Sequence, residues 1–174
     1  VSPCYTNTMT RGLQLGARLA GGNQAELFEL GKDVYKQYSP HVPAREARRM
    51  AIREARALKI VAPFADVPAA RLLGVRQIDG RWGVHMTRLE GKSFKELLDD
   101  GRDRRPYMEE MARRHVAMHG HRTLRLPPLK GWLEREIREA GRKRGAGFPT
   151  QHLLDRLATM PHSDRLCHGD FHFS

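Results

Sequence analysis

The pattern of hydrophobic and polar positions divides the chain into a strand-rich first half and a helical second half. Apolar residues alternate with polar ones over residues 13–19, and two further runs, 25–30 and 34–38, are each preceded by a glycine-containing turn. A period of two is typical of strands that bury one face. These three runs therefore predict an antiparallel meander.

One helix and two more strands complete the expected first half. Residues 44–59 follow Pro43 and consist mainly of Ala, Arg, Glu, Met and Leu, which are good helix formers. Residues 72–78 and 83–89 have strand patterns, and Asp79-Gly80 between them favours a tight hairpin. The predicted order is three strands, one helix and two strands.

Beyond Gly91 the spacing of apolar residues becomes that of helices. Ser93 and Glu96 form a capping box at the start of a helix over residues 93–100. We expect a boundary at Gly91, with one lobe over 1–91 and a second over 92–174. Within the second lobe the sequence predicts helices over 107–119, 129–140 and 151–157, a mobile basic loop rich in glycine over 141–147, and a short strand over 165–167.

The chain is strongly basic, because 31 Lys and Arg against 20 Asp and Glu give 174 residues a net charge of +11. The whole excess lies in two stretches that are predicted to be helical, 45–59 with a net charge of +4 and 101–145 with +7. Solvated helix faces explain this charge, and an anionic partner is the alternative. A nucleic-acid-binding module is the less favoured interpretation, since the sequence carries no zinc finger, helix-turn-helix or RNP-type aromatic motif.

The sequence contains no membrane-spanning run and no metal-binding motif, and these absences guide the expected location and metal content. Cys4 and Cys167 do not have metal-ligand spacing, and no apolar run approaches the roughly 20 residues that span a bilayer. We therefore expect a cytoplasmic protein without a membrane partner. His115 and His119 are four residues apart on a predicted helix, but no H-E-x-x-H pattern surrounds them and His115 lies on an apolar stripe. A buried or interface histidine is therefore favoured, and no metal ligand is predicted.

Lys36 is the first residue whose position suggests chemistry. It shares a strand face with Val34 and Tyr38, so if Val34 packs inward, Lys36 also points inward and needs a carboxylate or a phosphate. Glu54 lies within the apolar stripe of the predicted helix, whereas Glu46 lies toward its edge. Glu54 is therefore the better candidate partner. The alternative is that Lys36 extends into solvent from an edge strand and Glu54 pairs with a helical arginine.

Two further motifs lie on either side of this pair in the sequence. The turn Gly21-Gly22-Asn23 could bring backbone N–H groups close to a phosphate, although an ordinary hairpin has the same composition. His168-Gly169-Asp170 follows a short apolar segment. An aspartate in this position can accept a proton from a substrate hydroxyl, and a turn in which Asp170 caps the next segment is the alternative.

In this order, the motifs resemble those of the aminoglycoside phosphotransferase/choline kinase family of protein-kinase-like enzymes, over nearly all 174 residues. The resemblance implies an α+β, protein-kinase-like two-lobe fold, with an N-terminal antiparallel five-stranded sheet and one helix followed by an incomplete, mainly helical C-terminal lobe. The matching segments are the glycine turn with 25–28, then 34–36, 53–58, 84–91 and 166–172.

The resemblance also implies a role for each matching residue in binding ATP. Lys36 would hold the α- and β-phosphates with Glu54 as its ion-pair partner. The remaining contacts to the nucleotide would come from the turn residues Gly21, Gly22 and Asn23 and from the hinge residues Met86, Thr87 and Leu89. The first lobe, 1–91, would thus be the nucleotide-binding lobe.

The implied reaction transfers the γ-phosphate of ATP, with Mg²⁺, to a hydroxyl of a small molecule. Asp170 would be the catalytic base, and His168 would support its loop. The family pattern H-G-D-x-x-x-x-N places the magnesium-binding Asn one residue past Ser174, and the second metal-binding Asp further on. We therefore expect a truncated, inactive enzyme without metal ligands. The alternative is a non-catalytic nucleotide-binding or pseudokinase fragment.

Overall fold

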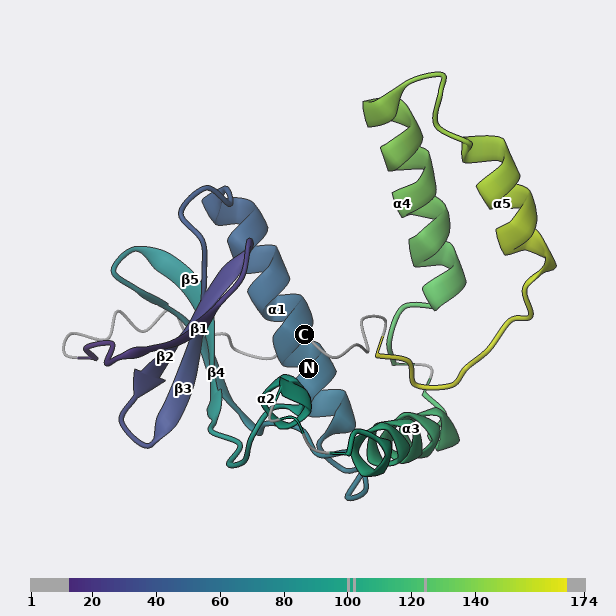
Figure 1. Cartoon of the computed structure of the whole chain (residues 1–174). Coiled ribbons are helices and arrows are strands. Elements are labelled where there is room, and N and C mark those ends of the chain that lie inside the picture. The colour runs from purple at the N-terminus through teal and green to yellow at the C-terminus, as the bar shows by residue number, and fades with distance from the viewer. Residues whose placement is uncertain (1–12, 100, 102, 124, 169–174) are drawn as a thin grey trace. The chain divides into compact units, whose positions relative to one another are not determined.

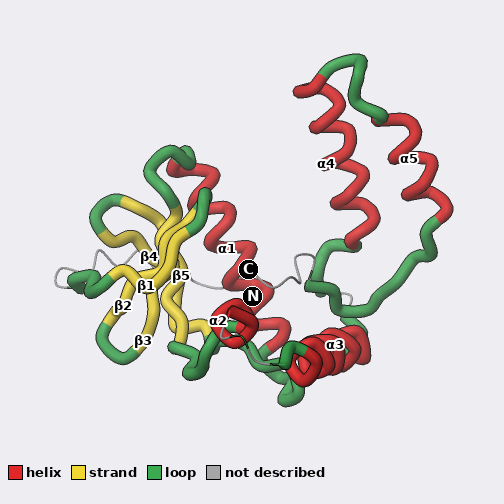
Figure 2. The backbone as a smooth tube through the Cα atoms, viewed as in Figure 1, coloured by secondary structure: helices red, strands yellow, loops and turns green. Residues whose placement is uncertain are grey.

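The computed structural model describes residues 13–99, 101, 103–123 and 125–168, which form two units that divide between Lys92 and Ser93. The first unit contains all five strands and one long helix, and the second contains four helices (Figures 1 and 2).

The five strands of the first unit form a single antiparallel sheet in the order β1-β2-β3-β5-β4. Helix α1, Ala44–Val61, connects β3 to β4. The predicted α+β class, with a five-stranded N-terminal sheet and one helix, is confirmed and is consistent with the amino-terminal lobe of a kinase-like fold. The strands are β1 (Arg18–Gly21), β2 (Ala25–Leu30), β3 (Asp33–Tyr38), β4 (Leu72–Ile78) and β5 (Arg81–Thr87).

The strand predicted over residues 13–19 is wrong in its position, because β1 begins only at Arg18. The preceding residues still run along β2: the Gly16 N–H donates to the Glu29 carbonyl, and the Glu29 N–H donates to the Ala17 carbonyl, both at 2.9 Å. The register shifts between Arg18 and Ala20. Such a bulge interrupts the hydrogen-bond ladder between β1 and β2. The alternating sequence pattern alone would predict a continuous ladder.

One face of the sheet packs against α1. Tyr38 and Val84 on the sheet form a core with Ala47 and Ala51 on the helix, and all four are buried. Alanine on this stripe lets the helix backbone approach the sheet closely. Lys36 is paired with Val84 across β3 and β5, so its side chain belongs to this same face.

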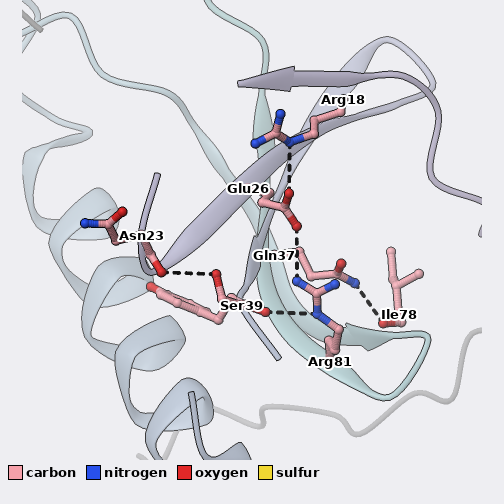
Figure 3. A network of polar contacts seen from close by, with 8 residues as sticks. Arg18, Asn23, Glu26, Gln37, Ser39, Ile78 and Arg81 are labelled. Carbon is pink, nitrogen blue, oxygen red and sulfur yellow. Dashed lines mark hydrogen bonds and ion pairs between the residues drawn. The ribbon is translucent and has the colours of Figure 1, made fainter. Parts of the chain in front are cut away.

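The opposite face of the sheet carries a polar network (Figure 3). The Glu26 carboxylate of β2 accepts from Arg18 of β1 at 2.9 Å and from Arg81 of β5 at 3.4 Å. Arg81 also donates through Nε to the Tyr38 carbonyl at 3.0 Å, and the Gln37 side-chain amide donates to a β4 carbonyl at 2.9 Å. The network thus connects all five strands of the sheet and fixes the backbone at the end of β3.

His85 lies on this second face, paired with Tyr35, and its ring nitrogens are buried without a hydrogen bond. Its Nε2 is 3.3 Å from an Asp33 carboxylate oxygen. Burial, together with the nearby Arg76 guanidinium, lowers the pKa of His85 below its ordinary value, while Asp33 opposes the shift. The neutral imidazole is therefore the favoured form in the folded chain.

Stability should consequently rise with pH through the range in which this histidine titrates. Because the pKa of His85 is lower in the folded chain, the unfolded chain takes up the proton first, and the free energy of unfolding falls as the pH drops below about 6.5. His85→Gln, which cannot titrate, should flatten that part of the curve. Thermal unfolding of both proteins from pH 5 to pH 8 measures this, and an unchanged slope in the variant would contradict it.

The second unit begins with a capped helix. The Ser93 N–H donates to the Glu96 carboxylate at 2.6 Å, and the Glu96 N–H donates to Ser93 Oγ at 3.2 Å, so the predicted capping box is confirmed. Among the described residues, no helix combines the length and the apolar character needed to cross a bilayer. The helices are α2 (Phe94–Asp99), α3 (Arg105–Gly120), α4 (Leu129–Arg144) and α5 (Thr150–Thr159).

Helices α4 and α5 lie side by side, and their contact corrects the predicted loop over residues 141–147 (Figure 1). Helix α4 continues through Gly141 to Arg144 and ends at Gly145, which has a positive φ of 77°. A Cβ on Gly141 would lie 2.2 Å from Thr150 Oγ1, so glycine permits the close approach of the two helices. The basic residues that suggested a loop instead occupy the last turn, where they favour the helix dipole.

The predicted strand over residues 165–167 is also wrong. Only an isolated bridge forms there, between Arg165 and Arg122, and the Leu166 N–H donates to the His121 carbonyl at 2.9 Å. Leu166 is buried and holds this segment in place. A single bridge is too short to count as a strand, although it fixes the path of the chain just before His168.

Candidate nucleotide-binding site

Lys36 and Glu54 form the ion pair that the sequence predicted. Lys36 Nζ lies 2.9 Å from Glu54 Oε1, and the two side chains are 35% and 25% exposed. Glu46 pairs instead with Arg49, at 2.9 Å. Because β3 lies between β2 and β5, Lys36 is not on an edge strand, and the interpretation in which it extends into solvent is wrong.

Tyr38 also contacts this ion pair, a contact that the sequence analysis did not identify. Its hydroxyl donates to Glu54 Oε2 at 2.7 Å, so the two carboxylate oxygens of Glu54 have different partners. Burial and the adjacent carboxylate raise the pKa of Tyr38 above its ordinary value, which keeps the hydroxyl protonated. The sequence shows that Tyr38 and Lys36 are two residues apart and share a strand face, but the contact with Glu54 depends on how α1 packs on the sheet.

The ion pair lines a cavity of about 260 Å³ between the sheet and α1. This volume is below the range of about 300–1,000 Å³ that is typical of sites for whole small molecules. Two cationic groups, those of Lys36 and Arg53, are among its walls. The cavity thus suits an anionic group of a larger ligand. Its lining residues are Gln24, Ala25, Lys36, Tyr38, Met50, Arg53, Glu54 and Ala57.

The glycine turn is attached to the end of β3 near this cavity. Ser39 donates through its N–H to the Gln24 carbonyl at 2.9 Å and through its hydroxyl to the Asn23 carbonyl at 3.4 Å (Figure 3). Gly21, Gly22 and Asn23 themselves are exposed. A Cβ on Gly21 would overlap the guanidinium of Arg18. The glycine therefore leaves room for the polar network on the face of the sheet opposite α1. The turn is therefore fixed at its base and open at its tip.

The expected hinge residues differ in their availability to a ligand. The Thr87 N–H donates to the Arg71 carbonyl at 3.0 Å, and Thr87 Oγ1 accepts from the Arg71 N–H at 2.9 Å. Met86 is partly buried in β5, whereas Leu89 follows the strand and is 59% exposed. An adenine could therefore not accept from the Thr87 N–H while this strand end is paired, which makes Leu89 the better candidate for that contact.

The structure describes only part of the segment that the sequence predicts to be catalytic. His168 is exposed and is the last described residue, while Gly169 and Asp170 lie outside the described residues. Asp170 as base therefore stays a prediction from the sequence. Within the described ranges, no group of three or more His, Cys, Asp or Glu side chains could hold a metal ion. His115 and His119 place their rings 4.3 Å apart on α3.

Many of the basic side chains have partners within the chain. On α1, Arg48 lies over the Trp82 ring at 5.5 Å, and Arg49 pairs with Glu46. In the second unit, carboxylates four residues earlier pair with Arg138 and Lys143. Such pairs support helix faces that contact solvent, and they weaken the case for a surface that binds nucleic acid.

The comparison with protein families agrees with this geometry. The family model described as the phosphotransferase enzyme family, APH, matches residues 16–174. That range includes β1 to β5, the cavity residues and the segment that ends in His168, and it covers far more than half of the 174 residues. A search of curated proteins found no match. The chain belongs to the phosphotransferase enzyme family.

Proposed function

We propose that this chain binds ATP through the cavity beside Lys36 and acts in the transfer of the γ-phosphate to a hydroxyl of a small molecule. The observation that carries the proposal is the Lys36–Glu54 ion pair of 2.9 Å in the wall of a cavity of about 260 Å³. A partly buried ammonium group that keeps one carboxylate partner and still faces a cavity has donors left for phosphate oxygens.

The described residues fit the phosphate part of the nucleotide. Lys36 and Arg53 supply positive charge, and the exposed turn over residues 21–23 leads directly into Gln24 in the wall of the same cavity, so its backbone N–H groups other than that of Gly22 are proposed to contact phosphate oxygens. The Gly22 N–H donates to the Ala25 carbonyl, which keeps the turn closed. When bound, ATP supplies the phosphoryl group and Mg²⁺ neutralises charge that develops on the phosphate oxygens. The role of these residues is to hold and orient the phosphates.

Asp170 is the proposed base, with His168 as a support for its loop. An aspartate that accepts the acceptor hydroxyl proton is the protein group that phosphoryl transfer of this type requires. The bridge at Arg165 and the buried Leu166 fix the chain that leads to this segment. Met86, Thr87 and Leu89 are proposed to contact the adenine, with Leu89 as the backbone donor.

Glu54→Gln tests the proposal without removing the lysine. Loss of the carboxylate charge should weaken binding of a fluorescent ATP analogue, mant-ATP, by about five- to tenfold, because Lys36 is no longer held in one position. Fluorescence titration with Mg²⁺ measures the affinity. Glu46→Gln, the same change on the same helix away from the cavity, is the matched control and should leave the affinity unchanged.

Transfer is tested separately from binding. ATP carrying a radiolabelled γ-phosphate is incubated with the chain, Mg²⁺ and a panel of small hydroxyl compounds, and Asp170→Asn is compared with the unmodified chain. Label in an acceptor that Asp170→Asn abolishes, with nucleotide affinity retained, supports the proposal. Binding without transfer would fit both the inactive enzyme that the absent metal ligands predict and the non-catalytic nucleotide-binding alternative. Tight, salt-sensitive binding of duplex RNA or DNA without ATP affinity would favour the nucleic-acid alternative.

A further inference from the structure

We propose that Tyr38 is a positioning residue that sets the orientation of Glu54 and, through it, the position of Lys36 at the nucleotide phosphates. The inference rests on the proposed ATP site. Tyr38, which is not part of the Lys36–Glu54 ion pair, would stabilise that pair before a nucleotide binds.

The division of the Glu54 carboxylate between two donors is the geometric basis. Oε1 accepts from Lys36 at 2.9 Å, and Oε2 accepts from Tyr38 at 2.7 Å. A carboxylate held at one oxygen can rotate about its last side-chain bond, whereas one held at both oxygens cannot do so without breaking a hydrogen bond. Tyr38 therefore restricts Glu54 to the orientation in which Oε1 faces Lys36.

The ring of Tyr38 has little freedom to move. Its exposed fraction is 4%, and it packs in the core cluster with Ala47, Ala51 and Val84. Burial and Glu54 raise the pKa of Tyr38, so its hydroxyl remains a donor across the range in which proteins are stable. A fixed ring and a permanent proton make Tyr38 a suitable anchor for a carboxylate that is itself 25% exposed.

The backbone of Tyr38 is fixed from the other face of the sheet. Arg81 Nε donates to the Tyr38 carbonyl at 3.0 Å, and the same guanidinium contacts Glu26, which also pairs with Arg18 (Figure 3). The next residue, Ser39, contacts the glycine turn through two hydrogen bonds. Tyr38 thus lies between three features: the glycine turn, the polar network on the face of the sheet opposite α1, and the Lys36–Glu54 ion pair.

Tyr38→Phe isolates the hydroxyl, because phenylalanine keeps the ring and fills the core. We expect mant-ATP with Mg²⁺ to bind about three- to fivefold more weakly, since Glu54 loses a hydrogen bond that restricts it. The matched control is Tyr35→Phe, on the same strand and the opposite face, where the hydroxyl donates to the Arg76 and Arg81 carbonyls. That control should lower the unfolding temperature and leave the nucleotide affinity unchanged.

A double-mutant cycle distinguishes positioning from a general structural effect. If Tyr38 acts through Glu54, Tyr38→Phe should change the affinity less than about twofold once Glu54→Ala is present. A loss of equal size in both backgrounds, or an equal loss in Tyr35→Phe, would overturn the inference while leaving the ATP site intact. If Lys36→Met and Glu54→Ala both bind mant-ATP as tightly as the unmodified chain, the proposed function itself fails.

Discussion

Lys36→Met should weaken ATP binding by about 10- to 100-fold while the chain stays folded. A hydrogen bond from a charged donor contributes about 1.5–3 kcal/mol, and the lysine is proposed to donate directly to phosphate oxygens. Methionine is unbranched and only one atom shorter than lysine, and the side chain is 35% exposed, so the core against α1 should tolerate the change. Titration with mant-ATP and Mg²⁺ gives the affinity, and thermal unfolding verifies the fold.

Lys32→Met is the matched control for this prediction. Lys32 lies in the exposed turn between β2 and β3, four residues from Lys36, and the substitution removes the same charge. It should change the affinity by less than about twofold at moderate salt, because long-range charge effects are screened beyond about 10 Å. An equal loss in the two variants would show that net charge rather than the site determines binding.

Gly83→Ala should be among the most destabilising single substitutions in the first unit. A Cβ at this position would lie 2.4 Å from the Lys36 carbonyl oxygen and 2.5 Å from Tyr35 Cζ. Neither neighbour can yield easily, because one is strand backbone and the other belongs to a ring with 0% exposure. We expect the free energy of unfolding to fall by more than about 3 kcal/mol, the range of severe overpacking. Urea unfolding measures the loss.

Gly22→Ala provides the comparison for Gly83→Ala. No atom lies within 4 Å of the Cβ that alanine would add there, and the residue is exposed in the turn. Its effect on stability should stay within about 0.5 kcal/mol, as for most surface substitutions. If Gly83→Ala were as stable as Gly22→Ala, the tight packing of β5 against β3 would be contradicted, and so would the rigidity of the strand that carries Lys36.

Local periodicity predicted the ion pair but left open the alternative in which Lys36 extends into solvent from an edge strand, which the strand order excludes. The period of two in β3 determines which face Lys36 occupies, and the helical repeat places Glu54 on the stripe toward the sheet. Both facts depend on neighbours within a few residues, and the helix begins at Ala44 as predicted. The tight hairpin at Asp79-Gly80 was also predicted from local sequence. The structure confirms it, since both residues have the positive φ that such a turn requires.

Features that depend on distant segments could not be predicted in this way. The bond from Tyr38 to Glu54 depends on how closely α1 packs on the sheet, and the extension of α4 past Gly141 depends on Thr150 across the helix pair. The Thr87 N–H is engaged by Arg71, sixteen residues away, which no local pattern indicates. Asp170 lies outside the described residues, so its role stays a prediction from the motif.

Chemical labelling of Lys36 tests the central claim most directly. An ATP analogue with an acyl group on its terminal phosphate reacts with a lysine amine next to the bound phosphates, forming an amide on the lysine and releasing the nucleotide. Mass spectrometry of the digested chain then locates the amide. The proposed site predicts preferential acylation of Lys36 that excess ATP suppresses. Labelling spread over other lysines, or labelling of Lys36 that excess ATP does not reduce, would contradict it.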